Sequence, residues 1–362
     1  MKLQTQLRKA VFMAFLLPYF SGDGGAQQPI QRQDPSSLSA PVHAALYPEV
    51  MCVHCILPEW DRGYILHHEI ERNADPEHPV VMMFDRNGKR VLEGRIWAPN
   101  FTSVSVITSG ATHAGEILAG AGGVMSNGSI EGFIAKTDLS GRTVQSVRIG
   151  QFILRQVCEA TDGTVWALGY NRENREFHDS NVLHHYSFER GLVGSFLPMD
   201  SISSASDAYL AIASPTKSYL RCGKDRVSVY LVPTADYIEV DVSTEKLVRW
   251  KVGPSSVTGG KATGFAVTEG GRIFVSFDDS SCSPCPKRSH ALYELKHGAE
   301  LSVANLAPIG GTLSVYDEKD VPSEGTFYRL WGADGNQLVV HRQGDGWGIS
   351  WVNITTSQVS PD

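Results

Sequence analysis

The chain has 362 residues, of which 42% are hydrophobic and 20% are charged. This composition excludes a low-complexity disordered chain. The 35 glycines and 18 prolines are typical of a protein with many turns and strands. A formal charge of −7 argues against a basic phosphate-binding surface, and therefore against a nucleic-acid partner.

Residues 1–26 have the features of a signal peptide. Lys2, Arg8 and Lys9 precede an apolar stretch over residues 10–20, and the small residues of 24–26 follow it. We expect cleavage after Ala26, a flexible lead-in over residues 27–40, and export to the periplasm or the extracellular space. The remaining chain has 29 basic and 38 acidic residues, a formal charge of −9. It has no run of about eighteen apolar residues, so no membrane span is expected.

A pattern of about fifty residues recurs along the chain. An apolar or aromatic strand end runs into an acidic turn, and the acidic markers are spaced by 53, 51, 52 and 53 residues. Asn353 follows at a further 59. Alternating apolar and polar residues between the turns predict four strands in each repeat, for example at 156–161, 164–170, 183–188 and 194–199. The markers are Asp85, Asp138, Glu189, Asp241 and Glu294.

Six such repeats predict an all-β fold, a six-bladed β-propeller of four-stranded antiparallel blades over residues 41–362. Asp-Gly-Thr-Val-Trp-Ala at 162–167 and Thr-Asp-Leu-Ser-Gly-Arg at 137–142 resemble the NHL-like exported members of the six-bladed propeller superfamily. The last repeat lacks room for its outer strand. We therefore expect the N-terminal stretch 41–50 to pair with the last blade and close the ring.

Six cysteines remain in an exported chain, where disulfides are chemically allowed. Cys52 and Cys55, like Cys282 and Cys285, form C-x-x-C motifs. We expect disulfides within or between these pairs, with a four-thiolate zinc site and a redox dithiol as the alternatives. Cys158 and Cys222 lie in consecutive repeats, so they either join the third and fourth blades or remain buried thiols.

Two histidine pairs and the acidic turn markers raise the question of a metal. Adjacent residues of a strand point to opposite faces, so neither His67-His68 nor His184-His185 is expected to chelate from one side. An aspartate that opens an Asp-x-x-Gly turn is better explained by hydrogen bonds to the turn backbone. Metal ligands and cofactors therefore stay unassigned.

The function expected from these observations is an exported binding or interaction module. Its ligand, a small molecule or a protein, would lie at the mouth of the propeller or on a rim. The alternative is a calcium-dependent hydrolase or lactonase with its metal in the central channel. Eight residues near predicted strand ends are the candidate ligand-binding residues: His113, Glu116, Asn171, Arg172, Asp278, Asp279, His341 and Arg342.

Overall fold

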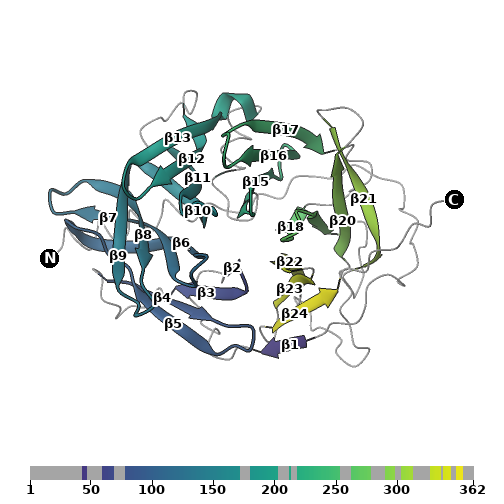
Figure 1. Ribbon diagram of the computed structural model, residues 1–362, viewed down its shortest axis with the longest axis horizontal. Coiled ribbons are helices and arrows are strands. Elements are labelled where there is room, and N and C mark those ends of the chain that lie inside the picture. The colour runs from purple at the N-terminus through teal and green to yellow at the C-terminus, as the bar shows by residue number, and fades with distance from the viewer. Residues whose placement is uncertain are drawn as a thin grey trace, which may run out of the picture. The chain divides into compact units, whose positions relative to one another are not determined.

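In a computed structural model, the described part of the chain consists almost entirely of antiparallel strands (Figure 1). All the residues that it describes belong to one unit spanning Arg32–Asp362. The predicted signal peptide, the whole lead-in and the two C-x-x-C motifs lie outside them. The described residues are 43–46, 59–68, 78–171, 180–202, 212, 218–252, 262–278, 290–297, 303–312, 327–335, 337–343 and 348–353.

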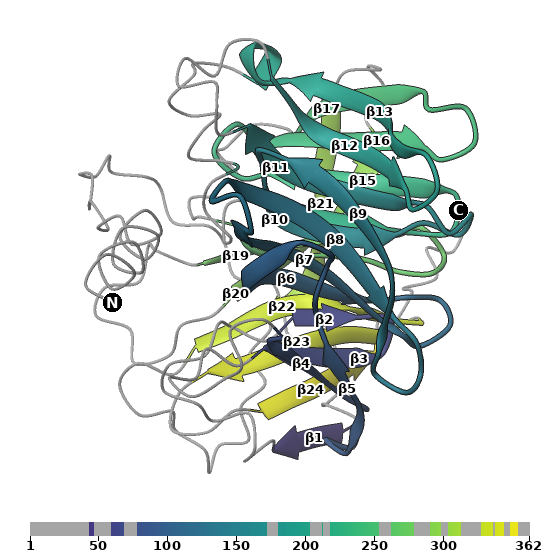
Figure 2. The same ribbon diagram turned by 90° about the vertical axis from the view of Figure 1, so that its left-hand side faces the viewer.

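Three sheets are simple four-stranded meanders, in which consecutive strands are hydrogen-bonded neighbours (Figure 2). The first contains β2 (Glu59–Asp61), β3 (Tyr64–His68), β4 (Val80–Phe84) and β5 (Arg90–Arg95). The second contains β6 (Phe101–Ala111), β7 (Ile117–Met125), β8 (Ile130–Thr137) and β9 (Thr143–Gly150). The third contains β10 (Phe152–Glu159), β11 (Val165–Asn171), β12 (Asn181–Ser187) and β13 (Gly191–Pro198), after which a 3₁₀ turn covers Met199–Ile202.

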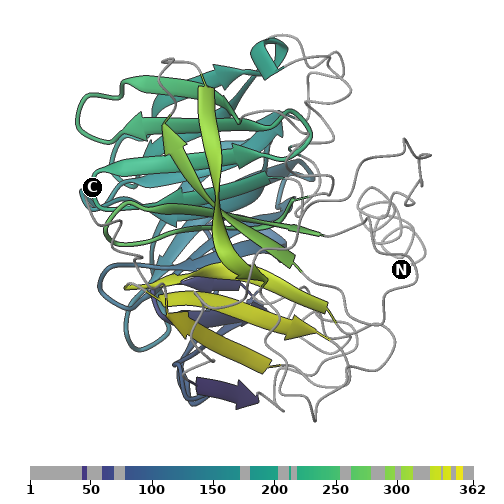
Figure 3. The same ribbon diagram turned by 90° about the vertical axis from the view of Figure 1, so that its right-hand side faces the viewer.

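The next eight strands form one sheet (Figure 1 and Figure 3). Two four-stranded meanders, β14–β17 and β18–β21, are joined by a parallel pairing of β17 with β21 that covers only two residue pairs. The strands are β14 (Ser218–Cys222), β15 (Arg226–Leu231), β16 (Asp236–Asp241), β17 (Leu247–Val252), β18 (Ala262–Val267), β19 (Ile273–Asp278), β20 (His290–His297) and β21 (Val303–Thr312).

The last sheet contains β22 (Phe327–Asp334), β23 (Gln337–Gln343) and β24 (Gly348–Asn353), and β1 (His43–Leu46) is its fourth strand. β1 pairs antiparallel with β24, with His43 opposite Trp351 and Leu46 opposite Gly348. The pairing expected for the stretch 41–50 is therefore present.

The described strands form five hydrogen-bonded sheets and not one sheet for each of the six predicted blades. The physical reason is the β17–β21 link. The first two sheets are also in contact, through an isolated parallel bridge between Arg95 and Arg142. This bridge is a single residue pair, and the two sheets remain separate. The prediction of four-stranded antiparallel units is confirmed, and the architecture is that of a β-propeller.

Apolar clusters lie between neighbouring sheets, as expected when each sheet buries both of its faces. One cluster joins the first and second sheets around Leu66 and Phe133, and another joins the third and fourth meanders around Trp166 and Ile238. The first and last sheets also share a cluster, in which the rings of Trp60 and Trp331 lie 6.4 Å apart. The first strands of neighbouring sheets contact one another, and β2, β6, β10 and β22 lie toward the middle of the unit in Figure 1.

The turn chemistry agrees with the sequence. Asp85 and Asp138 each use one carboxylate oxygen to accept two backbone N–H groups of their own turn. Asp241 does the same with Ser243 and Thr244. Glu294 is an exception, because it lies in β20 rather than in a turn and binds the guanidinium of Arg272 through both oxygens at 2.9 Å.

Candidate functional site

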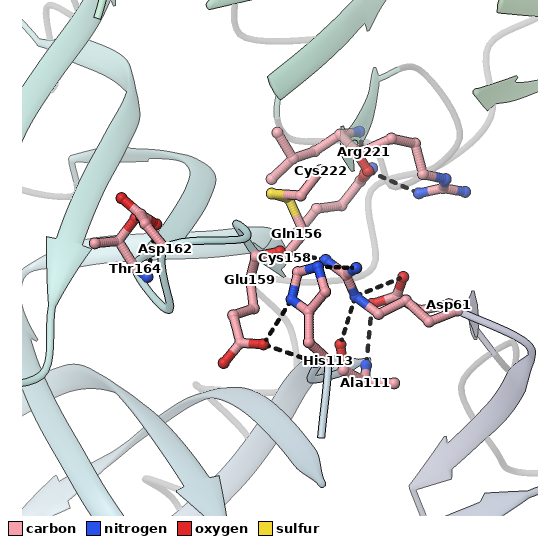
Figure 4. Close-up of a disulfide and its surroundings, with 12 residues drawn as sticks. Asp61, Ala111, His113, Gln156, Cys158, Glu159, Asp162, Thr164, Arg221 and Cys222 are labelled. Atoms are coloured by element: carbon pink, nitrogen blue, oxygen red, sulfur yellow. Dashed lines mark hydrogen bonds and ion pairs between the residues drawn. A yellow bond between two sulfur atoms is a disulfide. The ribbon is translucent and has the colours of Figure 1, made fainter. Parts of the chain in front are cut away.

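A disulfide and an amide side chain join β10 to β14 (Figure 4). Cys158 and Cys222 are bonded across the third and fourth meanders, with 5.6 Å between their Cα atoms. Two residues before Cys158, the Gln156 side chain donates to the Ser218 carbonyl and accepts from the backbone N–H of Leu220, at 2.5 and 2.6 Å. Of the two alternatives for Cys158 and Cys222, the structure shows the disulfide, whereas Cys52, Cys55, Cys282 and Cys285 lie outside the described residues.

Two carboxylates of β2 satisfy backbone groups of β6. Glu59 accepts from the N–H of Ser109 at 2.9 Å and from the hydroxyl of Thr108 at 3.1 Å. Asp61 accepts from the N–H of Ala111 at 3.0 Å. β6 is the first strand of its sheet, so one of its edges has no strand partner, and these side chains occupy donors that would otherwise be unpaired.

Arg62 links three sheets from the tip of the β2–β3 turn. Its φ is 48°, in the left-handed region, and the turn directs its side chain toward the second and third sheets. The guanidinium donates to the Ala111 carbonyl at 3.1 Å, to the Glu159 carbonyl, and to Nε2 of His113 at 2.7 Å. Ala111 is the last residue of β6, His113 lies in the turn that follows it, and Glu159 is the last residue of β10.

His113 is held in one tautomer by its two partners. An arginine can only donate, so Nε2 must accept and the ring proton lies on Nδ1. Nδ1 then donates to Glu159 Oε2 at 3.1 Å, and the same oxygen accepts the backbone N–H of His113 at 2.7 Å (Figure 4). Glu159 is 4% exposed, whereas the His113 side chain is 41% exposed. The cluster therefore presents an oriented imidazole above a buried carboxylate.

Lys136 of β8 compensates the charge of Glu159. Its Nζ lies 3.6 Å from Glu159 Oε1 and 3.0 Å from Glu116 Oε2. Burial alone would lower the pKa of Lys136, but the two carboxylates outweigh it and raise the pKa above its ordinary value. We call Asp61, Arg62, His113, Glu116, Lys136 and Glu159 the rim cluster.

Glu59 has a strongly shifted pKa. Burial raises it from 4.5 to about 7, against the hydrogen bonds from Ser109 and Thr108 and the charge of Arg221. Burial also raises the pKa of Asp61, against the charges of Arg62 and Arg221. Arg221 extends from β14 to the Trp331 carbonyl of β22 at 3.0 Å, so its charge lies among groups from several sheets.

The Glu59 shift predicts a pH-dependent stability. The folded chain keeps the Glu59 proton between pH 4.5 and about 7, whereas the unfolded chain releases it, so this group lowers stability as the pH rises through that window. Glu59→Gln removes the ionisation. We expect the variant to exceed the wild type by about 1–2 kcal/mol in free energy of unfolding above pH 7, and by nothing below about pH 4.5. Urea unfolding at pH 4, 6 and 8 measures this, and a difference that does not change with pH contradicts it.

Of the six predicted ligand-binding residues that the structure describes, it brings two together. His113 and Glu116 lie in the β6–β7 turn and belong to the rim cluster. Asn171 ends β11, opposite Phe152 at the start of β10, and is therefore at the far end of the third sheet from Glu159. Asp278, which ends β19, and His341 and Arg342, near the end of β23, occupy the corresponding far ends of their sheets. Arg172 and Asp279 lie outside the described residues.

Sequence reasoning missed the other rim-cluster members and Glu59. Their signal was the presence of charged residues in otherwise apolar strands: Lys136 stands between Ala135 and Thr137, and Glu159 between Cys158 and Ala160. A charged residue in a buried strand needs a partner. Which partner it finds depends on contacts between sheets, and the repeat pattern does not reveal them.

The histidine pairs behave as expected of strand residues. Ile65 and Leu66 belong to clusters on opposite faces of the first sheet, and His67 and His68 continue this alternation. Burial lowers the pKa of His67, and it lowers that of His68 to about 4. In the second pair, His184 stacks on Phe152 and His185 stacks on Trp166. Neither pair presents two imidazoles on one side.

The carboxylates of Glu59, Asp61 and Glu159 do not fit a calcium site. Calcium requires several free oxygen ligands, but Glu59 and Asp61 accept from backbone N–H groups, and Glu159 is bound by His113 and Lys136. Within the described part of the chain, no three His, Cys, Asp or Glu residues are placed to hold a metal ion. The same residues include no helix long and apolar enough to cross a membrane.

Similarity to known proteins is found in structure and not in sequence. No family model matches the sequence, and no curated protein matches it. Among solved structures, a Bacteroides fragilis protein whose name calls it exported is similar at a TM-score of 0.50 and 10% identity, covering 91% of this chain and 99% of that one. A luciferin-regenerating enzyme gives a TM-score of 0.43 at 11% identity, covering 86% and 95%. The β-propeller domain of a Pyrococcus furiosus protease gives 0.41 at 9% identity, covering 84% and 82%. The order of the sheets and the contacts between their first strands, described above, make the chain a β-propeller.

Proposed function

We propose that the chain is an exported, six-bladed β-propeller that acts as a binding module and holds a small polar molecule at the rim cluster. The observation that carries the proposal is the exposed, oriented imidazole of His113. It is fixed by the buried Glu159 on one side and by Arg62 of another sheet on the other. Both ring nitrogens are hydrogen-bonded within the protein, so the imidazole offers a ligand its exposed ring, and groups from three sheets hold that ring in one orientation beside charged side chains.

The six-bladed assignment is supported by the two meanders of the eight-stranded sheet. β14–β17 and β18–β21 each have the antiparallel order of a complete blade, and only two residue pairs join them. The cluster shared by the first and last sheets, together with the β1–β24 pairing, supports a ring closed by the N-terminal strand. Export is supported by the signal-like N-terminus and by the Cys158–Cys222 disulfide. The name of the Bacteroides fragilis neighbour agrees with it.

A thermal-shift screen tests the binding function. The probes are a panel of sugars, amino acids and dicarboxylic acids, and binders are then measured by calorimetry. We expect at least one class to raise the melting temperature of the wild type. His113→Ala should weaken its binding at least tenfold, because it removes the exposed ring and the groups that hold Arg62 and Glu159 in place around it. Arg148→Ala is the control, since it breaks an exposed ion pair with Glu131 elsewhere on the second sheet. Binding that survives His113→Ala unchanged contradicts the proposal.

A further inference from the structure

An apolar groove lies where the first and second sheets meet. Its volume is about 360 Å³, within the range of small-molecule sites. The β6–β7 turn separates it from the rim cluster: His113 belongs to the cluster, whereas Ala114 and Gly115 line the groove. The other lining residues are Tyr64, Met83, Asp85, Val91, Leu92 and Leu139.

The groove has unusually exposed apolar walls. Leu139 is 69% exposed and Val91 is 45% exposed. Leu139 occupies the tip of the β8–β9 turn, whose hydrogen bonds are made by the backbone and by Asp138. The turn therefore does not require a leucine, and an apolar side chain left in water beside a groove is typical of a binding surface.

One carboxylate of this groove, that of Asp85, forms no ion pair among the described residues. Asp85 Oδ1 accepts the N–H groups of Asn87 and Lys89. Nearby acids differ, because Asp138 is paired with Arg142 at 3.2 Å and Glu93 with Arg90 at 3.1 Å. The groove thus combines apolar walls, the aromatic ring of Tyr64 and a carboxylate that forms no ion pair among the described residues.

We propose that this groove binds a small organic cation with an apolar body, such as an aryl or alkyl ammonium compound. The apolar part contacts Leu139, Val91 and Leu92, and the cation lies near Asp85 and Tyr64, since both a carboxylate and an aromatic face attract ammonium groups. The negative charge of the chain, −7 overall, favours the approach of a cation. This inference extends the proposed binding function to a second site, beside the rim cluster.

Three probes of the same size but different charge test the ligand class: benzyltrimethylammonium, benzyl alcohol and phenylacetate. Calorimetry or NMR titration of the full chain is expected to give at least tenfold tighter binding for the cation than for the alcohol, and the weakest binding for the anion. Equal affinity for cation and alcohol overturns the charge assignment. Absence of binding by all three overturns the site.

Matched variants locate the binding. Leu139→Arg is expected to abolish it, whereas Leu192→Arg, at a 53% exposed leucine of β13, should leave it unchanged. Asp85→Asn keeps the oxygen that caps the turn and should weaken only the binding of the cationic probe, by about tenfold. Asp138→Asn changes the equivalent turn of the second sheet in the same way and should leave the affinity for all three probes unchanged. His113→Ala should leave this binding intact, which separates the groove from the rim cluster. Loss of binding in both members of either pair contradicts the proposal.

Discussion

Replacing both Cys158 and Cys222 by alanine is expected to lower the free energy of unfolding by about 4 kcal/mol. The bond closes a loop with a sequence separation of 64, and a cross-link over that length restricts the unfolded chain strongly. Cys158 is 4% exposed, so the alanine variant also loses some packing between the third and fourth meanders. Equilibrium unfolding in guanidinium chloride without reductant measures the change.

The single variants provide the control for this prediction. Cys158→Ala and Cys222→Ala each break the same bond, so each should come within about 1 kcal/mol of the double variant. Gln156→Ala removes the neighbouring amide contacts to β14 but keeps the disulfide, and it should cost about 1–3 kcal/mol because the groups of Ser218 and Leu220 lose their partner. A double variant as stable as the wild type would show that the link does not constrain the unfolded chain.

The repeat unit could be read from the sequence because it depends on local chemistry. The strands predicted at 164–170 and 183–188 are β11 (Val165–Asn171) and β12 (Asn181–Ser187). Their alternation and their turn glycines are determined within each hairpin. The number of hydrogen-bonded sheets could not be read in the same way, because two residue pairs between β17 and β21 decide it.

The rim cluster was less predictable for a related reason. Asp61, Arg62 and Glu159 come from the first and third sheets, and their partners lie on an edge strand of the second sheet and in the turn that follows it. A repeat pattern places each residue on a strand but does not show which neighbouring edge its side chain reaches. His113 and Glu116 were found because they lie in a turn, where exposed polar side chains are expected.

Neighbouring sheets also meet through their outer strands, and one glycine allows the closest of these contacts. The Arg95 N–H donates to the Gly141 carbonyl at 2.9 Å, and the Thr143 hydroxyl donates to the Arg95 carbonyl at 2.7 Å. These bonds draw the β8–β9 turn against β5. A Cβ on Gly141 would lie 1.9 Å from the Glu93 carbonyl oxygen, so the approach requires a residue without a side chain.

Gly141→Ala is therefore expected to destabilise the fold by about 3 kcal/mol. The φ of Gly141 is +80°, where alanine costs about 1 kcal/mol more than glycine. Displacing the backbone of β5 to relieve the clash adds roughly 2 kcal/mol. Gly163→Ala is the matched control: its φ is +79°, its turn has the same two backbone hydrogen bonds, and nothing lies within 4 Å of the added Cβ. The free energy of unfolding of Gly163→Ala should fall by only about 1 kcal/mol, and urea unfolding of both variants measures the difference. An equal decrease in both variants would show that β5 moves aside freely and that the outer-strand contact contributes little to holding the first two sheets together.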